Sequence, residues 1–418
     1  MKIQDFRKEN KPETIFPAEK ETIMSSNSIN ARFPRFPFRL PLLLDGATGT
    51  AMMESGMPSG SCPEQWILEH PEPLSLLQKR YIESGADAVL TPTFGANRTV
   101  LSRYSLEKET VSINRSLACV SRNAAGNHVL LGGDLSPTGN YLFPVGNTDF
   151  DELVSIYTEQ ASALLSYVDF FFLETNMDLA CVRAAVTGIK EISDKPIFVT
   201  MTVTKSGKTM SGDTPEACLL TLSELGISAF GLNCSTGPRE MLSHLRPLFP
   251  LSVSLGIPLI AKPNAGTPSD KNSCSDTVRE FSEIGTQMLS CGICILGGCC
   301  GTDERHIAAL RKDIETFDDT SFPVCTSTDT RYLASTNREI VCIPHELPFP
   351  LVPDDDFLDA AQDMADKYGF LYLRLDSREA ADVVLESALS LPAPLALSSD
   401  SAAAPYFRRR FCGKAPLI

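Results

Sequence analysis

The chain has 418 residues, enough for one large domain and a smaller one, and 43% of them are apolar, as in ordinary globular proteins. Its formal net charge of −15 argues against nucleic acid or an anionic membrane surface as the main partner. No apolar run approaches the roughly 18 residues of a membrane span, so we expect no membrane-embedded segment.

Residues 1–40 carry charges, prolines and the run Phe33-Pro-Arg-Phe-Pro-Phe-Arg39, without the order of a signal peptide. We expect a disordered leader there, with an organelle or partner address as the alternative. The 13 cysteines are spread through predicted strands and helices of a long chain. This distribution fits a reducing compartment, where thiols are buried or bound to metal, better than a disulfide framework. We therefore expect a cytoplasmic protein.

Between residues 41 and 315, short apolar runs alternate with longer helical patterns. The runs are apolar throughout, as expected for parallel strands that are covered on both faces. Eight such repeats match the usual size of a closed (β/α)8 barrel, about 250 residues, and an open doubly wound sheet is the alternative. The expected strands are Leu42–Asp45, Ala88–Phe94, Val129–Leu135, Phe170–Thr175, Ile197–Thr202, Ala229–Cys234, Leu259–Asn264 and Ile293–Cys300, and the helices between them include Pro73–Glu83, Asp151–Leu165, Asp178–Ile189 and Pro215–Leu225.

After residue 315 a loop rich in Asp, Thr, Ser and Pro breaks the repeat, and we expect a linker over residues 316–335. Residues 336–418 then show a β-α-β-α-β pattern, too short to close a barrel of its own, which predicts a small, incomplete α/β region. The expected strands are Glu339–Ile343, Phe370–Leu375 and Leu395–Leu397, with helices Phe357–Tyr368 and Arg378–Leu389. The last residues, Ala415–Ile418, look like the start of a further strand.

Polar and glycine-rich motifs fall at or just past the carboxyl ends of the predicted barrel strands. In a barrel these ends form one rim, where active sites are built. The shared position of the motifs, rather than any single one, predicts a site at this rim. The motifs are Asp45-Gly-Ala-Thr-Gly-Thr50, Thr91-Pro-Thr-Phe-Gly95, Gly133-Asp134, Glu174-Thr-Asn-Met-Asp178, Asn233-Cys234, Lys262-Pro-Asn-Ala-Gly266 and Gly297-Gly-Cys-Cys-Gly-Thr302.

Three cysteines of these motifs form a candidate metal site. Cys234 ends one predicted strand, and Cys299 and Cys300 end another, so the three thiols can converge on one point. A soft metal such as zinc is the usual occupant of that arrangement, and three cysteines leave one coordination position open, as catalytic zinc does. Adjacent strand residues point to opposite faces, but the glycines that flank the Cys-Cys pair allow the strand to break there. The alternative is a set of small buried residues.

Other polar residues have competing explanations. Glu174 ends an almost wholly apolar strand, where a carboxylate must face a polar rim or a ligand because its unpaired burial is costly. Asp45 is either a ligand contact or a turn or cap residue. Asp178 and His306 fit helix starts better than ligand roles. The formal C-x-x-C motif Cys291–Cys294 fits core packing, since Cys294 lies inside a predicted strand.

Together the motifs resemble the homocysteine S-methyltransferase family, the zinc-dependent barrel found as the first module of cobalamin-dependent methionine synthase. The similarity spans residues 41 to about 311 in the family's order and includes Leu44–Thr50, Thr91–Asn97 and Gly231–Pro238. It implies that homocysteine sulfur takes the open position of a zinc ion. The residues to which the resemblance assigns roles are Cys234, Cys299 and Cys300 as zinc ligands, Asp45 and Glu174 as holders of the substrate's ammonium, and Asn264 as a weak ligand close to the metal.

The resemblance implies transfer of a methyl group to the thiol of L-homocysteine, giving L-methionine. Segments Pro394–Ser401 and Arg408–Ile418 resemble a piece of the pterin-binding barrel of methionine synthase, without that barrel's entry motif. We therefore expect a methylcobalamin-bearing partner protein as the methyl donor, and cobalamin only through that partner. One alternative is an S-methylmethionine- or betaine-dependent homocysteine methyltransferase. The other is a truncated, non-catalytic zinc-binding protein.

Overall fold

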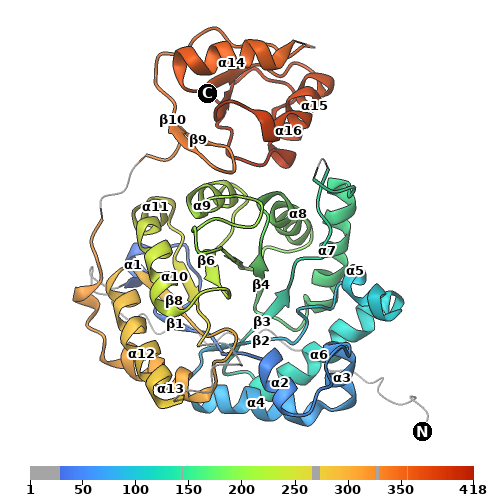
Figure 1. Cartoon of the computed structure of the whole chain (residues 1–418), viewed down its shortest axis with the longest axis vertical. Coiled ribbons are helices and arrows are strands. Elements are labelled where there is room, and N and C mark those ends of the chain that lie inside the picture. Colours follow the sequence, from blue (N-terminus) through green and yellow to red (C-terminus); the bar gives the residue numbers. More distant parts are fainter. Residues whose placement is uncertain (1–28, 144, 266–273, 326–328, 355) are drawn as a thin grey trace.

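The computed structural model describes residues 29–143, 145–265, 274–325, 329–354 and 356–418. Its first part contains eight parallel strands: β1 (Leu42–Leu43), β2 (Ala88–Leu90), β3 (Leu130–Leu135), β4 (Phe170–Asn176), β5 (Ile197–Met201), β6 (Ala229–Asn233), β7 (Leu259–Lys262) and β8 (Ile293–Leu296). From β2 to β8 each strand pairs with the next in sequence, and β8 also pairs with β1. A bridge between Leu44 and Ala88 joins β1 to β2, so the sheet closes into the predicted (β/α)8 barrel (Figure 1).

Helices surround this sheet (Figure 1). Several of them begin at the capping residues that the sequence supplies, because side-chain oxygens accept from otherwise unpaired backbone N–H groups. Asp149, Asp178 and Thr214 act in this way, and the prediction that Asp178 caps a helix is confirmed. The helices are α2 (Gly49–Glu54), α3 (Pro63–Glu69), α4 (Pro71–Glu83), α5 (Arg98–Leu101), α6 (Thr110–Ala125), α7 (Phe150–Leu164), α8 (Leu179–Lys190), α9 (Pro215–Ser223), α10 (Pro238–Leu245), α11 (Phe249–Leu255), α12 (Cys274–Ser290) and α13 (Glu304–Thr316).

Residues 29–40 are folded, so the prediction of a disordered leader is wrong for them. The segment begins with α1 (Ile29–Arg32), and the side chain of Phe33 is completely buried. The prolines and charges of this segment interrupt any helical or strand-like hydrophobic periodicity, so the sequence pattern did not predict a folded element there. Its aromatic side chains are nevertheless apolar enough to be buried against the barrel. The rest of the predicted leader, residues 1–28, lies outside the described residues.

The same segment closes the amino-terminal end of the barrel. Phe36 stacks on Phe198 with ring centroids 5.5 Å apart, and Phe38 meets Phe170 edge-on at 5.9 Å. Phe170 is the first residue of β4, and Phe198 is the second of β5. Aromatic pairs at such spacings add to the free energy gained from burial. The segment is therefore an integral part of the barrel's core.

We expect Phe33→Ala to lower the free energy of unfolding by about 3–5 kcal/mol, because it leaves a cavity at a fully buried position. Phe349→Ala is the matched control, since this ring is 95% exposed and its removal should change stability by less than about 0.5 kcal/mol. Urea unfolding of both variants provides the comparison. Equal stabilities for Phe33→Ala and the wild type would show that the segment contributes nothing to the core.

The C-terminal region contains two small sheets and three helices. Its first two strands form an antiparallel pair, and its last two pair in parallel. Single parallel bridges at Leu351 and Leu417 extend the parallel sheet on either side. The elements are β9 (Leu333–Ser335), β10 (Ile340–Cys342), α14 (Phe357–Tyr368), β11 (Leu371–Leu373), α15 (Arg378–Glu386), β12 (Leu395–Leu397) and α16 (Ala404–Arg410).

Two expectations for this region need correction. The strand expected at Glu339–Ile343 does not belong to the parallel sheet, and its partner β9 falls inside the expected linker, residues 316–335. The physical reason is the short connection between β9 and β10. A turn in which Thr336 N donates to Glu339 O returns the chain directly, and such short connections join antiparallel strands.

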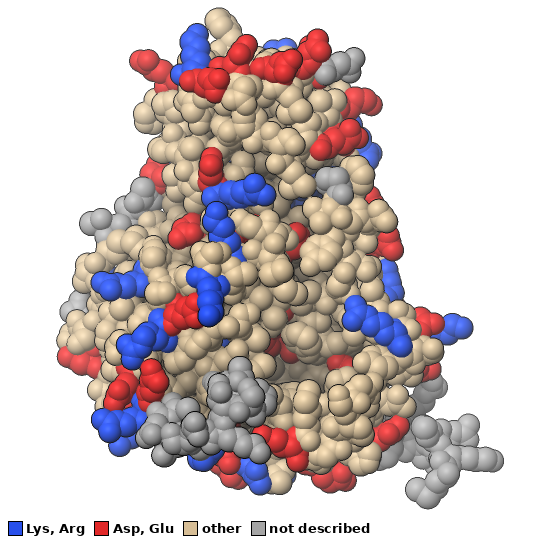
Figure 2. All heavy atoms as spheres, viewed as in Figure 1, with Lys and Arg blue, Asp and Glu red and all other residues tan. Residues whose placement is uncertain are grey.

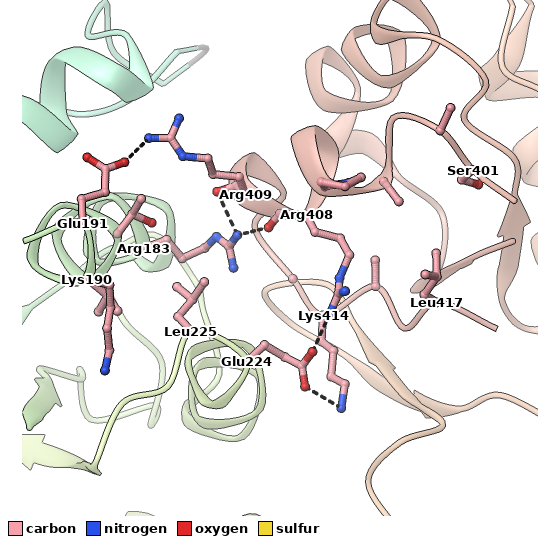
Figure 3. A pocket seen from close by; sticks show the side chains of 17 residues that line it. Arg183, Lys190, Glu191, Glu224, Leu225, Ser401, Arg408, Arg409, Lys414 and Leu417 are labelled. Atoms are coloured by element: carbon pink, nitrogen blue, oxygen red, sulfur yellow. Dashed lines mark hydrogen bonds and ion pairs between the residues drawn. The ribbon is translucent and has the colours of Figure 1, made fainter. Parts of the chain in front are cut away.

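The C-terminal region lies beside α8 and α9 of the barrel (Figure 1). Buried Arg183 of α8 donates from Nη2 to the carbonyl oxygens of Arg408, at 2.5 Å, and Arg409, at 3.1 Å, in the last turn of α16 (Figure 3). Burial lowers the pKa of Arg183 to about 10. Arg408 also pairs with Glu224 at 2.7 Å, and Arg409 pairs with Glu191 at 2.7 Å. Carbonyl groups at a helix end attract a cation, so Arg183 fastens α16 to the barrel.

We expect Arg183→Met to loosen the C-terminal region while leaving the barrel folded. The substitution keeps an apolar stem but removes the donor to two helix-end carbonyls, at a cost of about 1–3 kcal/mol. Limited proteolysis should then cleave the stretch around residues 317–332 several times faster. Arg239→Met is the control, because Arg239 lies outside this stretch, is exposed and pairs with exposed Glu280. Equal cleavage rates for both variants would contradict this role of Arg183.

Candidate metal and substrate site

The three predicted cysteines come together at the carboxyl-terminal rim of the barrel. The Sγ atoms of Cys234, Cys299 and Cys300 all lie within 4.8 Å of one another, and no second cluster of potential metal-binding side chains is found in the part of the chain that is described. The predicted strands were too long, because β6 ends one residue before Cys234 and β8 ends at Leu296. The thiols therefore project from loops, whose backbone can turn all three inward.

The loop backbone explains how these cysteines reach one point. Cys234 and Ser235 have φ values of 60° and 57°, a left-handed conformation that non-glycine residues rarely adopt and that clusters at functional sites. A Cβ atom at Gly298 would lie 2.3 Å from Thr302 Oγ1, so only glycine fits there. The Thr302 hydroxyl donates to the Cys299 carbonyl at 2.7 Å, and this bond holds the turn that carries the Cys-Cys pair.

The donor set of this cluster fits zinc. Hydrogen bonds from the Cys299 and Cys300 thiols lower the pKa of Cys234 below that of a free thiol, and their hydrogen bonds to Cys234 raise the pKa values of Cys299 and Cys300. The side chain of Asn264 lies beside Cys234, and its Oδ1 is buried with no hydrogen-bond partner among the described residues. Three soft sulfur donors and one unused oxygen suit a four-coordinate site.

Two predicted carboxylates lie next to the cluster, and a lysine joins them. Lys262 Nζ is 3.0 Å from Glu174 Oε1 and 3.8 Å from Asp45 Oδ1, and all three side chains are buried. Asn233 Nδ2 donates to the same Glu174 oxygen at 3.1 Å. Sequence analysis gave no role to Lys262, although a lysine at the end of the buried strand Leu259–Lys262 was a usable signal, since a buried charge needs a partner.

A further carboxylate, Asp134 at the end of β3, lines the same cavity. Burial raises the pKa of Asp134 well above its usual range, and the charge of Glu174 adds to this effect. Burial also raises the pKa of Asp45 to about 6, against the opposing influence of Lys262. Burial alone would lower the pKa of Lys262, but the charges of Glu174 and Asp45 outweigh it and raise that pKa. The cavity therefore has more negative than positive groups.

This cavity has a volume of about 300 Å³, at the lower end for small-molecule sites. Cys234, Cys299 and Cys300 lie on its wall together with the buried acids, whereas Asn264 is not among its lining residues. The lining also includes apolar side chains, among them Met52, Met57, Ile67, Leu90 and Phe94. Such a site can take a small molecule that has a thiol, a cationic group and a short apolar chain.

His306 and Cys294 have the structural roles that the sequence predicted for them. His306 is buried, and its Nδ1 lies 2.8 Å from Asp303 Oδ1 in the capping box of α13. It is not part of the cysteine cluster. Cys294 is fully buried inside β8, where its thiol packs in the barrel core. The interpretation of Cys291–Cys294 as core packing rather than a redox or metal motif is therefore supported by the burial of Cys294.

A closed (β/α)8 barrel with a three-thiol cluster and buried acids at its carboxyl-terminal rim defines the class of this protein. A model of the homocysteine S-methyltransferase family matches residues 42–314. The chain belongs to this family, as its motifs indicated, and it is a methyltransferase by class.

Two curated relatives are methionine synthases. The chain is 29% identical over 306 residues to that of Mycobacterium leprae (strain TN) and 30% identical over 290 residues to that of Mycobacterium tuberculosis (strain ATCC 25618 / H37Rv). These alignments cover 67% and 63% of the chain. The chain spans only about a quarter of the length of these relatives, 25% and 24%.

Solved structures agree on the fold. The metallated form of the homocysteine methyltransferase MmuM from Escherichia coli superimposes with a TM-score of 0.55 at 22% sequence identity. The match covers 65% of this chain and 95% of that one. The apo form of the same protein gives a TM-score of 0.52 at 20% identity. This similarity supports the barrel architecture of the first part of the chain.

The surface and the helices add two observations. On the face shown in Figure 2, Lys and Arg side chains are interspersed with Asp and Glu rather than gathered in one basic patch. Among the helices of the described residues, none combines the length and the apolar character needed to cross a bilayer.

Proposed function

We propose that this protein transfers a methyl group to the thiol of L-homocysteine and forms L-methionine, with zinc as its cofactor. The convergence of three thiols on one cavity wall, beside buried carboxylates, is the observation that carries the proposal. Acceptor and donor meet at this wall: the sulfur–carbon bond forms as the donor's bond to the methyl group breaks, and the thiol proton is released to solvent. The reduced cysteines fit a cytoplasmic enzyme of methionine biosynthesis.

Cys234, Cys299 and Cys300 would hold the zinc ion, with Asn264 as a weak fourth ligand. A bound zinc ion would supply Lewis acidity that deprotonates a coordinated thiol, whose pKa is otherwise about 8.5. The chain's own contribution is to fix the three sulfurs through the turns at Cys234 and Gly298, so that little reorganisation is needed when substrate binds.

Asp45 and Glu174 would hold the ammonium group of homocysteine. Both are buried in the cavity, and a cationic ligand would compensate their charges. The same contacts would orient the thiol toward the cysteine cluster. These carboxylates select the substrate by charge and do not take part in the bond changes.

A methylcobalamin-bearing partner protein is the proposed donor. Every residue that lines the cavity lies between Asp45 and Cys300, so the described C-terminal region contributes nothing to its wall. Phe143 and Met210, in the loops that follow β3 and β5, are 69% and 68% exposed. A protein that docks over these loops could cover both side chains.

X-ray absorption at the zinc edge, with and without L-homocysteine, tests the proposal. We expect one zinc per chain with three sulfur ligands, rising to four when homocysteine is added. Assays with methylcobalamin, S-methylmethionine and betaine then identify the donor, and turnover with either small donor alone would replace the partner by that molecule. A sulfur count that ignores homocysteine would overturn the proposal and favour a non-catalytic zinc-binding protein.

A further inference from the structure

Asp134 is a buried carboxyl group that Lys262 compensates only in part, since the two side chains form no direct ion pair. It lies in the cavity, 6% exposed, and its Oδ1 has no hydrogen-bond donor among the described residues. Its backbone is well anchored, since its N–H donates to Thr91 Oγ1 at 3.0 Å and its carbonyl accepts from Thr93 Oγ1 at 2.7 Å. Burial of a carboxylate without a donor is costly, which is why the pKa of Asp134 is raised. A cationic ligand bound beside Asp134 would favour its ionised form.

The neighbouring acids are partly occupied already. Glu174 Oε1 accepts from both Lys262 and Asn233. Asp45 Oδ2 accepts from the backbone N–H of Leu90 at 2.8 Å, whereas its Oδ1 has no hydrogen bond and lies 3.8 Å from Lys262 Nζ. The cavity lining therefore has four acidic side chains, Asp45, Glu64, Asp134 and Glu174, and a single lysine, Lys262.

An amino-acid ammonium group has three N–H donors, as a lysine ammonium does. Asp45 and Glu174 offer two carboxylates to it under the proposed function. Asp134 lines the same cavity, and its Oδ1, which has no donor among the described residues, supplies an acceptor from a third carboxyl group. Asp134 lies on β3, whereas the cysteines of the cluster lie in the loops that follow β6 and β8. The carboxyl group and the thiols therefore reach the cavity from different strands of the barrel.

We propose that Asp134 binds the ammonium group of the substrate directly and determines the preference for α-amino thiols over thiols that lack the amino group. This inference rests on the proposed function, since it names a further substrate contact of the same site. Lys262 pairs directly with Glu174 and approaches Asp45, whereas no described residue forms an ion pair with Asp134 or donates to its Oδ1.

Calorimetric titration of zinc-loaded protein tests this role without relying on turnover. The probes are L-homocysteine and 4-mercaptobutanoate, which keeps the thiol and carboxylate but lacks the amino group. We expect Asp134→Asn to weaken homocysteine binding at least about tenfold, as for loss of one charge-assisted hydrogen bond of about 1.5–3 kcal/mol. Binding of 4-mercaptobutanoate should stay within about twofold of the wild type or become tighter.

Two further measurements separate the possible outcomes. Asp134→Asn should be at least as resistant to thermal unfolding as the wild type, because the substitution removes a buried carboxyl group that is compensated only in part; a lower melting temperature with both ligands equally weakened would mean a structural role and overturn the inference. Unchanged homocysteine affinity in a stable variant would overturn it as well. If wild-type protein bound neither thiol, the proposed function itself would fail, which is distinct from the failure of Asp134 alone.

Discussion

Cys299→Ala should abolish zinc retention and reduce methyl transfer to homocysteine by at least about 30-fold, because without the metal only about 3% of a thiol with pKa about 8.5 is ionised at pH 7. The three sulfurs lie within 4.8 Å of one another, so the substitution removes one of the three proposed sulfur ligands. Metal analysis after gel filtration, together with the product assay, checks both parts of the expectation.

Cys291→Ala is the matched control for this experiment. Cys291 lies near Cys299 in the sequence and is only partly buried, but it is not part of the cysteine cluster. We expect the control to retain one zinc per chain and near-normal activity. Loss of zinc from the control as well would point to a different ligand set, and retention of zinc by Cys299→Ala would remove that residue from the site.

Gly231→Ala should lower the free energy of unfolding by about 3 kcal/mol or more, because overpacking against backbone cannot be relieved by a rotamer change. A Cβ atom at this position of β6 would lie 1.9 Å from the carbonyl oxygen of Ile260 in β7. The two strands would have to separate, and Cys234 three residues later would move with β6. Chemical denaturation should show the loss of stability, and metal analysis should show weakened zinc retention.

Gly237→Ala serves as the comparison for this substitution. It lies in the loop after Cys234, and a Cβ atom there would meet nothing within 4 Å. Its φ of −75° is open to any residue, so we expect a change of less than about 1 kcal/mol. If the Gly231→Ala and Gly237→Ala variants had the same free energy of unfolding, β6 and β7 could separate without cost. The close approach of Gly231 to Ile260 would then have no structural importance.

The barrel and its cysteine cluster were predictable from sequence because both follow from local patterns. Apolar runs marked the buried strands, and the rule that strand ends share a rim brought Cys234 close to Cys299 and Cys300. Strand ends were predicted less well, since the left-handed turn at Cys234 depends on contacts made elsewhere in the fold. Such long-range contacts cannot be inferred from the local pattern of residue types.

Other features depend on tertiary partners that lie far away in the sequence. The aromatic segment 29–40 is buried only because the barrel offers Phe170 and Phe198 to it. The link between Lys262 and Glu174 joins residues that are far apart in the chain, and neither residue type alone indicates the pair. The hairpin of β9 and β10 required recognition of a turn within a stretch that resembled a linker.

The aromatic packing at the amino-terminal end closes the barrel on the side away from the cavity. Phe36 and Phe38 pack against Phe198 and Phe170, and none of these rings is among the residues that line the cavity. In the proposed reaction, both substrates would therefore use the carboxyl-terminal mouth. A bulky donor bound at that mouth would block homocysteine, so an excess of such a donor should inhibit the reaction by competing with homocysteine.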